Sequence, residues 1–207
     1  MSVITKDWDS MLSEYLKSDD FKALGKFIQS RRKTFNIRVY PSNKDIFAAF
    51  RLVSPNELKA VVVNFEPARE YQSNGLAFGS NGAGAMPLPT CLIYKEYENT
   101  IWNGLDLLFD YSMTHIAKKG VLMLNLALTV DSRESHVNEW LGFTKYLLTK
   151  LNGKCPFFII GEKAFGCSGL IPNSEIKQYD KVLGSNVFYE IEKLTDIKFK
   201  NTTKWKI

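Results

Sequence analysis

Val61–Ser80 reads VVVNFEPAREYQSNGLAFGS, and the order of residue types within this stretch decides the fold. The β-branched run Val61–Val63 is typical of a buried strand. A polar loop with Glu66 and Arg69 follows, and the chain then returns to the apolar Leu76–Phe78 between two glycines. Ligands of an open parallel sheet bind beyond the carboxyl ends of its strands. A carboxylate just after a strand, with an aromatic ring nearby, therefore indicates a pocket for a flat polar ring; the alternative is an ordinary solvated loop.

The composition predicts one globular domain over residues 1–207. Hydrophobic residues make up 45% and charged residues 24%, which is ordinary for a soluble protein with a substantial core. No apolar run reaches the length of a membrane helix, and the first residues lack the pattern of a signal peptide. The scattered Cys91, Cys155 and Cys167 favour free thiols in the cytoplasm. A net charge of +5 permits a polyanionic partner without identifying one.

Two further apolar runs extend the pattern set by the first. Val121–Asn125 and Pro156–Gly161 are short and apolar throughout, as buried strands are. Segments with apolar residues at helical spacing separate the runs, for example Val137–Leu151. Strands that alternate with helices and are apolar on both faces indicate an α/β fold with a mostly parallel central sheet. Between them, Ser80–Pro89 is rich in small residues and is predicted to be a loop that a partner can approach closely.

Two polar residues stand out near the second run. Asn125 ends an otherwise apolar strand, and a buried asparagine must be hydrogen-bonded. It is either a structural amide that ties two loops together or a reader of a base edge. His136 is interpreted as a surface or capping histidine in preference to a catalytic one, because the sequence gives it no fixed partner.

The chain lacks the sequence patterns of the common cofactor and metal sites. There is no GxxxxGK[ST] loop, no GxGxxG after a strand, and no His/Cys spacing suited to a metal. We therefore expect neither a cofactor nor a metal ion.

Five segments, in order and with compatible spacing, carry a resemblance to a known family. They cover nearly the whole chain and resemble the family 1 uracil-DNA glycosylases: VYPSNKDIFAAFRLVSPNELKAVVV (39–63), GLAFGS (75–80), GVLMLNLALTV (120–130), SHVNEWLGFTKYLL (135–148) and GSNVFYEIEKL (184–194). The resemblance implies a three-layer α/β/α fold with a central four-stranded, mostly parallel sheet. It also implies DNA, single- or double-stranded, as the partner, with the target nucleotide flipped out of the stack.

The resemblance also assigns roles to individual residues. It places Phe78 in a stack on the flipped base and Asn125 in hydrogen bonds to the pyrimidine edge. Glu66 and Asn125 are the expected catalytic residues, and Phe65 and Ala68 complete the expected base-binding set. Contacts to the DNA backbone, which position a protein without reading sequence, are expected from Arg69, Pro87, Pro89, Thr90, Gly184 and Ser185.

Three departures from the family pattern fall in the expected pocket. The family loop Gly-Gln-Asp-Pro-Tyr-His aligns with Asn64–Arg69, so Glu66 replaces the aspartate and Ala68 replaces the tyrosine. Glutamate moves the carboxylate by one methylene, which matters for a general base and leaves electrostatic stabilisation as an alternative. Alanine opens space beside C5 of the base. The family's His-Pro-Ser-Pro-Leu-Ser segment has no counterpart, and no histidine follows His136.

These observations predict a DNA glycosylase-like hydrolase that acts on a flipped pyrimidine. The expected base is uracil or a 5-substituted uracil, namely thymine, 5-hydroxymethyluracil or a hypermodified base of a viral genome. The chemistry is N-glycosidic cleavage, as in DNA repair, or modification at C5. The alternatives are a plain uracil-DNA glycosylase of reduced activity, or an impaired glycosylase fold that serves as a DNA-binding or replication-complex module. A replication or DNA-modification protein is a further expected partner, in the cytoplasm of the cell or of a viral host.

Overall fold

A four-stranded parallel sheet forms the centre of the protein. The computed structural model describes residues 4–82, 86–100 and 110–199. The strand order is β3-β2-β5-β6 and every neighbouring pair is parallel, for the strands β2 (Ala60–Asn64), β3 (Val121–Asn125), β5 (Phe157–Ile160) and β6 (Ile176–Tyr179). All three strands expected from the sequence are present, and the predicted α/β class is confirmed.

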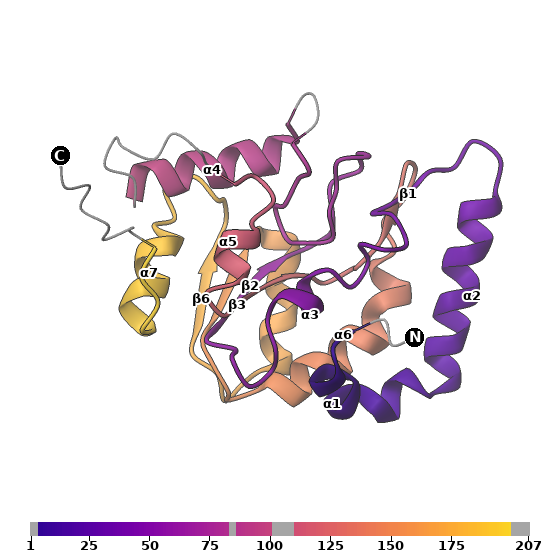
Figure 1. Ribbon diagram of the computed structural model, residues 1–207, viewed down its shortest axis with the longest axis horizontal. Coiled ribbons are helices and arrows are strands. Elements are labelled where there is room, and N and C mark those ends of the chain that lie inside the picture. Colours follow the sequence, from indigo (N-terminus) through magenta and orange to yellow (C-terminus); the bar gives the residue numbers. More distant parts are fainter. Residues whose placement is uncertain (1–3, 83–85, 101–109, 200–207) are drawn as a thin grey trace.

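Helices cover both faces of this sheet. The short helices α3 (Ala49–Leu52) and α5 (Thr114–Ala117) lie on one side, and the 3₁₀ helix η1 (Glu162–Leu170) lies on the other (Figure 1). The remaining helices are α1 (Lys6–Leu16), α2 (Asp19–Lys33), α4 (Leu88–Thr100), α6 (Val137–Leu151) and α7 (Val187–Leu194). Helix α6 packs against η1 and also against α1 and α2, and α4 packs against α7. The three-layer α/β/α architecture is therefore confirmed.

The core explains why the strands are apolar on both faces. Each residue of β3 and of β5 is buried, as are the first four residues of β2. A cluster of aromatic rings continues the core between helices: Trp8, Phe47, Phe50, Trp140 and Phe143, with ring centroids 5.2–6.0 Å apart and mostly edge-on. Such edge-to-face pairs add to the hydrophobic stabilisation of the layers.

Two elements differ from what the sequence predicts. The strand β6, at one edge of the sheet, was not expected, because its sequence Ile-Lys-Gln-Tyr is half polar and the strand is only half-buried. Helix α4 begins at Leu88, so Pro89 lies in its first turn instead of in the preceding loop. Proline fits there because the first turn of a helix needs no backbone N–H donor. Apolar residues at helical spacing, among them Leu105, Leu108, Tyr111 and Ile116, also predict a helix from Thr100 onward, and this segment lies largely outside the described residues.

A small antiparallel pair lies beside the main sheet. Strand β1 (Val39–Tyr40) pairs with β4 (Val130–Asp131), which follows β3 by a few residues. This pair fixes the chain between the carboxyl end of β3 and the start of α6. In the part of the chain that the structure describes, no helix is both long enough and apolar enough to cross a membrane.

Candidate active site

The site begins where β2 and β3 end side by side. Asn64 and Asn125 are partners in the register of these two strands. Two backbone hydrogen bonds extend the pairing beyond the strands, from Leu126 N to Asn64 O (2.9 Å) and from Ala127 N to Phe65 O (3.1 Å). The side chains that follow β2 are thus held rigidly against those that follow β3, as a precise binding site requires.

Asn125 is buried at this position, with 1% of its surface exposed. Its Oδ1 accepts a hydrogen bond from Nδ2 of Asn64 (2.9 Å). Its own Nδ2 is buried and donates to no group among the described residues. A buried donor without an acceptor costs about 1–3 kcal/mol and is rare in native proteins, which makes a ligand the natural partner of this amide.

Glu66 lies two residues beyond β2, and its carboxylate is held on one side only. Arg69 contacts Oε1 through Nη2 (3.1 Å) and Nε (3.4 Å). The other oxygen, Oε2, is buried and accepts no hydrogen bond within the described residues. One oxygen is thus anchored by a cation while the other is left to act on water or on a developing positive charge.

Phe78 is held in an unusual backbone conformation beside the same strand ends. Its φ is +61°, in the left-handed region that costs a residue with a side chain about 1–2 kcal/mol. The hydroxyl of Thr90 donates to the carbonyl of Phe78 (2.7 Å), and Ala77 N donates to Met123 O of β3 (3.0 Å). These contacts fix the Phe78 loop against β3, close to Asn125. Thr90 is 1% exposed, so its side chain supports Phe78 from inside and does not face a phosphate.

The residues expected at the DNA backbone differ in how accessible they are. Pro87 precedes α4 and is buried, whereas Pro89 in the first turn of the helix is exposed. The backbone amide of Gly184 donates to the buried carboxylate of Glu96 (2.6 Å), so this amide is already occupied. The hydroxyl of Ser185 accepts from Val187 N (3.3 Å) at the start of α7. The phosphate contacts of these residues stay predictions.

Sequence reasoning missed Lys163 beside the site. It follows β5, the other neighbour of β2, and its Nζ lies 5.8 Å from the centroid of the Phe65 ring. The side chain is exposed. A cation directly after a central strand is a signal that the sequence carries, but only the strand order shows that β5 lies beside β2.

An apolar cavity of about 290 Å³ opens next to Phe65. It lies between α6 and η1 and is bordered by Leu126, which follows Asn125, and by Lys163. Phe65 is half-buried at its edge, and Ala68 is half-buried in the adjoining loop. Hence the loop after β2 combines a carboxylate, an aromatic ring and a small residue at one end of the sheet.

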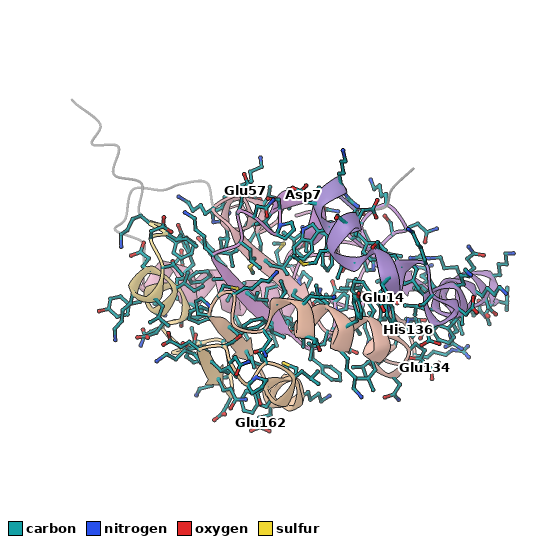
Figure 2. All side chains as sticks on the ribbon, turned by 90° about the horizontal axis from the view of Figure 1, so that it is seen from below. Asp7, Glu14, Glu57, Glu134, His136 and Glu162 are labelled. Atoms are coloured by element: carbon teal, nitrogen blue, oxygen red, sulfur yellow. The ribbon has the colours of Figure 1, made fainter. Side chains whose placement is uncertain are left out.

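His136 belongs to a buried network instead of to the surface. The side chain is 0% exposed, Thr129 Oγ1 lies 2.9 Å from Nδ1, and Asp131 Oδ2 lies 3.1 Å from Nε2. Trp140 Nε1 donates to Thr129 Oγ1 (2.7 Å), and Arg31 pairs with Asp131. The expected surface position is therefore wrong. His136 does stand at the N-cap position of α6, but its side chain makes no capping hydrogen bond there. Figure 2 shows His136 next to Glu134, another partner of Arg31 (2.8 Å).

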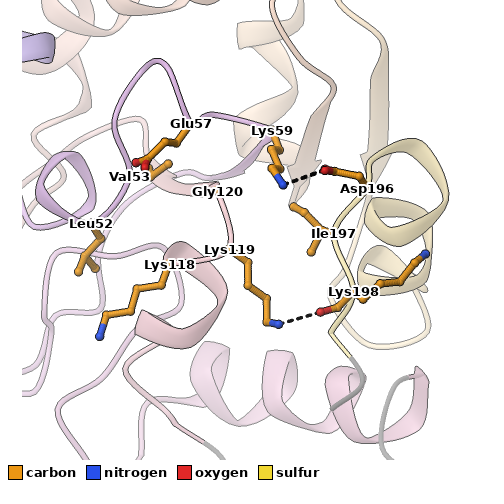
Figure 3. Close-up of a pocket in the computed structure, with 10 residues that line it drawn as sticks. All are labelled: Leu52, Val53, Glu57, Lys59, Lys118, Lys119, Gly120, Asp196, Ile197 and Lys198. Atoms are coloured by element: carbon orange, nitrogen blue, oxygen red, sulfur yellow. Dashed lines mark hydrogen bonds and ion pairs between the residues drawn. The ribbon is translucent and has the colours of Figure 1, made fainter. Parts of the chain in front are cut away.

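A second hollow lies at the opposite end of the sheet. This groove of about 430 Å³ is lined by Lys59 and Gly120, which precede β2 and β3, and by Lys118 and Lys119 (Figure 3). Lys59 pairs with Asp196 (3.0 Å), and Lys119 Nζ donates to a backbone carbonyl (2.7 Å). The groove is basic, but it is separated from Asn64 and Asn125 by the length of the strands.

Within the described residues, no group of three or more His, Cys, Asp or Glu side chains is arranged to hold a metal ion. The three cysteines form no disulfide, and burial raises the pKa of Cys167 to about 11. The groups that the structure does place at the site are a carboxylate, amides, aromatic rings and nearby cations.

Comparison with solved structures finds the same fold. The uracil-DNA glycosylase of mimivirus superposes with a TM-score of 0.75 at 18% identity, over 88% of this chain and 70% of that one. The corresponding enzyme structure from Nitratifractor salsuginis gives a TM-score of 0.65 at 17% identity, over 93% of both chains. At such low identities these likenesses show the fold alone.

Curated sequences add closer relatives, although no protein-family model matches the chain. A uracil-DNA glycosylase of Coxiella burnetii is 32% identical over 176 residues, which are 82% of this chain and 76% of the relative. One from Fusobacterium nucleatum is 32% identical over 156 residues, or 73% and 67%. The chain therefore belongs to the uracil-DNA glycosylases, a family of DNA glycosylases that hydrolyse N-glycosyl bonds.

Proposed function

We propose that this protein excises uracil from DNA by hydrolysing the N-glycosidic bond. The observation that carries the proposal is the buried Nδ2 of Asn125, which has no partner in the described part of the chain, together with the carboxylate of Glu66, which Arg69 holds through one oxygen only. A pyrimidine between them satisfies the amide through a ring carbonyl and brings its sugar toward the carboxylate. Phe78, held by Thr90, supplies the ring on which the base stacks.

The chemistry follows from where charge develops. As the C1′–N1 bond breaks, its electron pair leaves with the base, and the sugar becomes positively charged at C1′. The carboxylate of Glu66 stabilises this cation and accepts a proton from the water that adds to C1′. The proton is then available to the departing base. His136 takes no part, since both of its ring nitrogens are engaged in the buried network.

Cations around the site favour a polyanionic substrate. Arg69 and Lys163 both lie at the carboxyl end of the sheet and are exposed. Phosphates on either side of a flipped nucleotide are suitable partners for them. The exposed Pro89 and the turn at Gly184–Ser185 are the other backbone contacts that we assign.

The replacement at Ala68 widens the proposed substrate range. The side chain at this position ends at Cβ, where the family motif carries a tyrosine ring. We infer that thymine and 5-hydroxymethyluracil enter the pocket as well as uracil, because nothing at residue 68 reaches toward C5.

A single-turnover assay tests the proposal. The substrates are oligonucleotides, duplex and single-stranded, with uracil, thymine, 5-hydroxymethyluracil or cytosine at one position, and mass spectrometry identifies abasic products and mass additions. We expect abasic product from uracil, and a loss of about 10²–10³ in rate for Glu66→Gln with DNA affinity retained. Salt-dependent binding without any product would reject the proposal in favour of a DNA-binding module. A mass addition would instead indicate modification at C5.

A further inference from the structure

The amide of Asn64 fixes the direction in which the amide of Asn125 points. The backbone carbonyl of Glu66 can only accept a hydrogen bond, so the Asn64 atom 2.7 Å from it is Nδ2. The second hydrogen of this nitrogen is directed at Asn125, 2.9 Å away, and the atom that receives it must be Oδ1. Nδ2 of Asn125 is thereby turned away from Asn64, and this is the nitrogen that finds no acceptor among the residues that the structure describes.

We propose that Asn64 is a positioning residue that makes the site select uracil over cytosine. This inference rests on the proposed function. Uracil carries a carbonyl at C4, which accepts from Nδ2 of Asn125, whereas cytosine carries an amino group there, which would face the same donor. A free asparagine amide can turn by 180° and exchange its oxygen and nitrogen. By donating to Oδ1, Asn64 prevents that turn.

The arrangement departs from the family motif. Asn64 aligns with the glycine that opens the family motif Gly-Gln-Asp-Pro-Tyr-His, and glycine has no side chain to donate. Both asparagines lie at paired positions on neighbouring strands, and the backbone bond from Leu126 N to Asn64 O closes the pair. The contact therefore needs little further ordering of the chain, and a fixed donor in a buried site discriminates strongly between bases.

The variant Asn64→Asp tests the inference, because aspartate has the same shape but cannot donate. Its carboxylate attracts Nδ2 of Asn125 and turns Oδ1 toward the base, where it can accept from the amino group of cytosine. Affinities are measured by fluorescence anisotropy on DNA with 2′-fluoro-2′-deoxyuridine or 2′-fluoro-2′-deoxycytidine, which resist cleavage. We expect the wild type to favour uracil at least tenfold and the variant to lower this ratio by about 10- to 100-fold.

Asn74→Asp is the matched control. Asn74 is also buried and also donates from Nδ2 to a backbone carbonyl, that of Ser112 (3.0 Å), but it does not contact Asn125. Unfolded protein lowers both affinities equally and so does not change their ratio. Because Asn74 does not orient Asn125, this variant should keep the preference for uracil. An unchanged ratio in Asn64→Asp, or a wild type that binds both DNAs equally, would overturn the inference. If the wild type binds uracil DNA more tightly but does not cleave it, the proposed reaction is rejected while the role of Asn64 in selecting uracil stands.

Discussion

At the scale of single residues, the proposed function makes the size of residue 68 decide what can stand beside C5 of a bound base. Replacing Ala68 with tyrosine restores the ring of the family motif. We expect Ala68→Tyr to excise uracil at nearly the wild-type rate and to lose at least about tenfold in kcat/KM on 5-substituted uracils, since one methyl group that no longer fits costs 10-fold or more. Single-turnover rates on uracil and 5-hydroxymethyluracil DNA measure this; equal behaviour on both would show that residue 68 does not border C5.

Thr90 controls Phe78 through one buried hydrogen bond. Thr90→Val keeps the shape of the side chain but leaves the Phe78 carbonyl without its donor. Because that bond supports a left-handed residue, we expect a loss of about 1–2 kcal/mol in the free energy of unfolding and weaker binding of uracil DNA. Urea denaturation and anisotropy measure the two effects. Thr90→Ser retains the hydroxyl and should stay close to the wild type, so equal losses in both variants would contradict this role.

Sequence motifs pointed to Asn125 and Phe78, which the structure places near each other at the carboxyl end of the sheet, but not to the contacts that orient them. Asn125 and Phe78 are recognisable because each stands in a motif of fixed order. Asn64 and Lys163 come close to these residues only because the strands pair, which brings together segments about 60 and 100 residues apart. The internal role of Thr90 was missed because a threonine near prolines is equally suited to an exposed loop.

At the scale of elements, the network around Asp131 joins α2, β4 and α6. Burial alone would raise the pKa of Asp131. Hydrogen bonds from the amides of Arg133 and Glu134 and from the side chains of Arg31 and His136 outweigh burial and lower this pKa far below its usual value. The carboxylate therefore stays charged in the folded protein at a pH where the unfolded chain already binds a proton.

This difference predicts how stability depends on pH. Above about pH 4 both states are ionised at Asp131, and the network contributes fully; as pH falls below 4, only the unfolded state takes up the proton, so stability is lost. Asp131→Asn should lower the free energy of unfolding by about 2–3 kcal/mol at pH 7 and remove this part of the acid dependence. Urea denaturation at pH 7 and pH 3 measures it. Asp19→Asn, at an exposed pair with Lys22, should change little.

Apolar runs revealed three of the four main strands, because buried parallel strands are apolar on both faces. Strand β6 could not be found in this way, since its residues are only partly buried and half of them are polar, whereas β3 at the other edge of the sheet is buried throughout. Helix α4 begins at Leu88, inside the segment predicted to be a loop, because proline is compatible with both a loop and the first turn of a helix. Local sequence patterns thus predict the fully buried elements. The half-buried strand β6 and the ends of helices depend on contacts with segments distant in the sequence.

At the scale of the whole molecule, cationic side chains lie at two opposite ends of the sheet, and the proposed reaction can use only one of these ends to hold DNA. In the proposed reaction a flipped base reaches Asn125 at the carboxyl end, which would place the phosphates beside it near Lys163. The groove with Lys118 lies at the amino ends of the strands. The net charge does not show which of the two surfaces binds DNA. The direction of the strands does, because it places Asn125 at one end of the sheet and the groove at the other.

The salt dependence of DNA binding separates the two surfaces. Each phosphate contact adds about one to the slope of log affinity against log salt concentration. We expect Lys163→Ala to weaken binding to uracil DNA and to reduce the slope by about one. Lys118→Ala removes the same charge from the far groove and should leave both the slope and the affinity unchanged. If Lys118→Ala reduced the slope and Lys163→Ala did not, DNA would lie across the amino ends of the strands, and a base bound there could not reach Asn125.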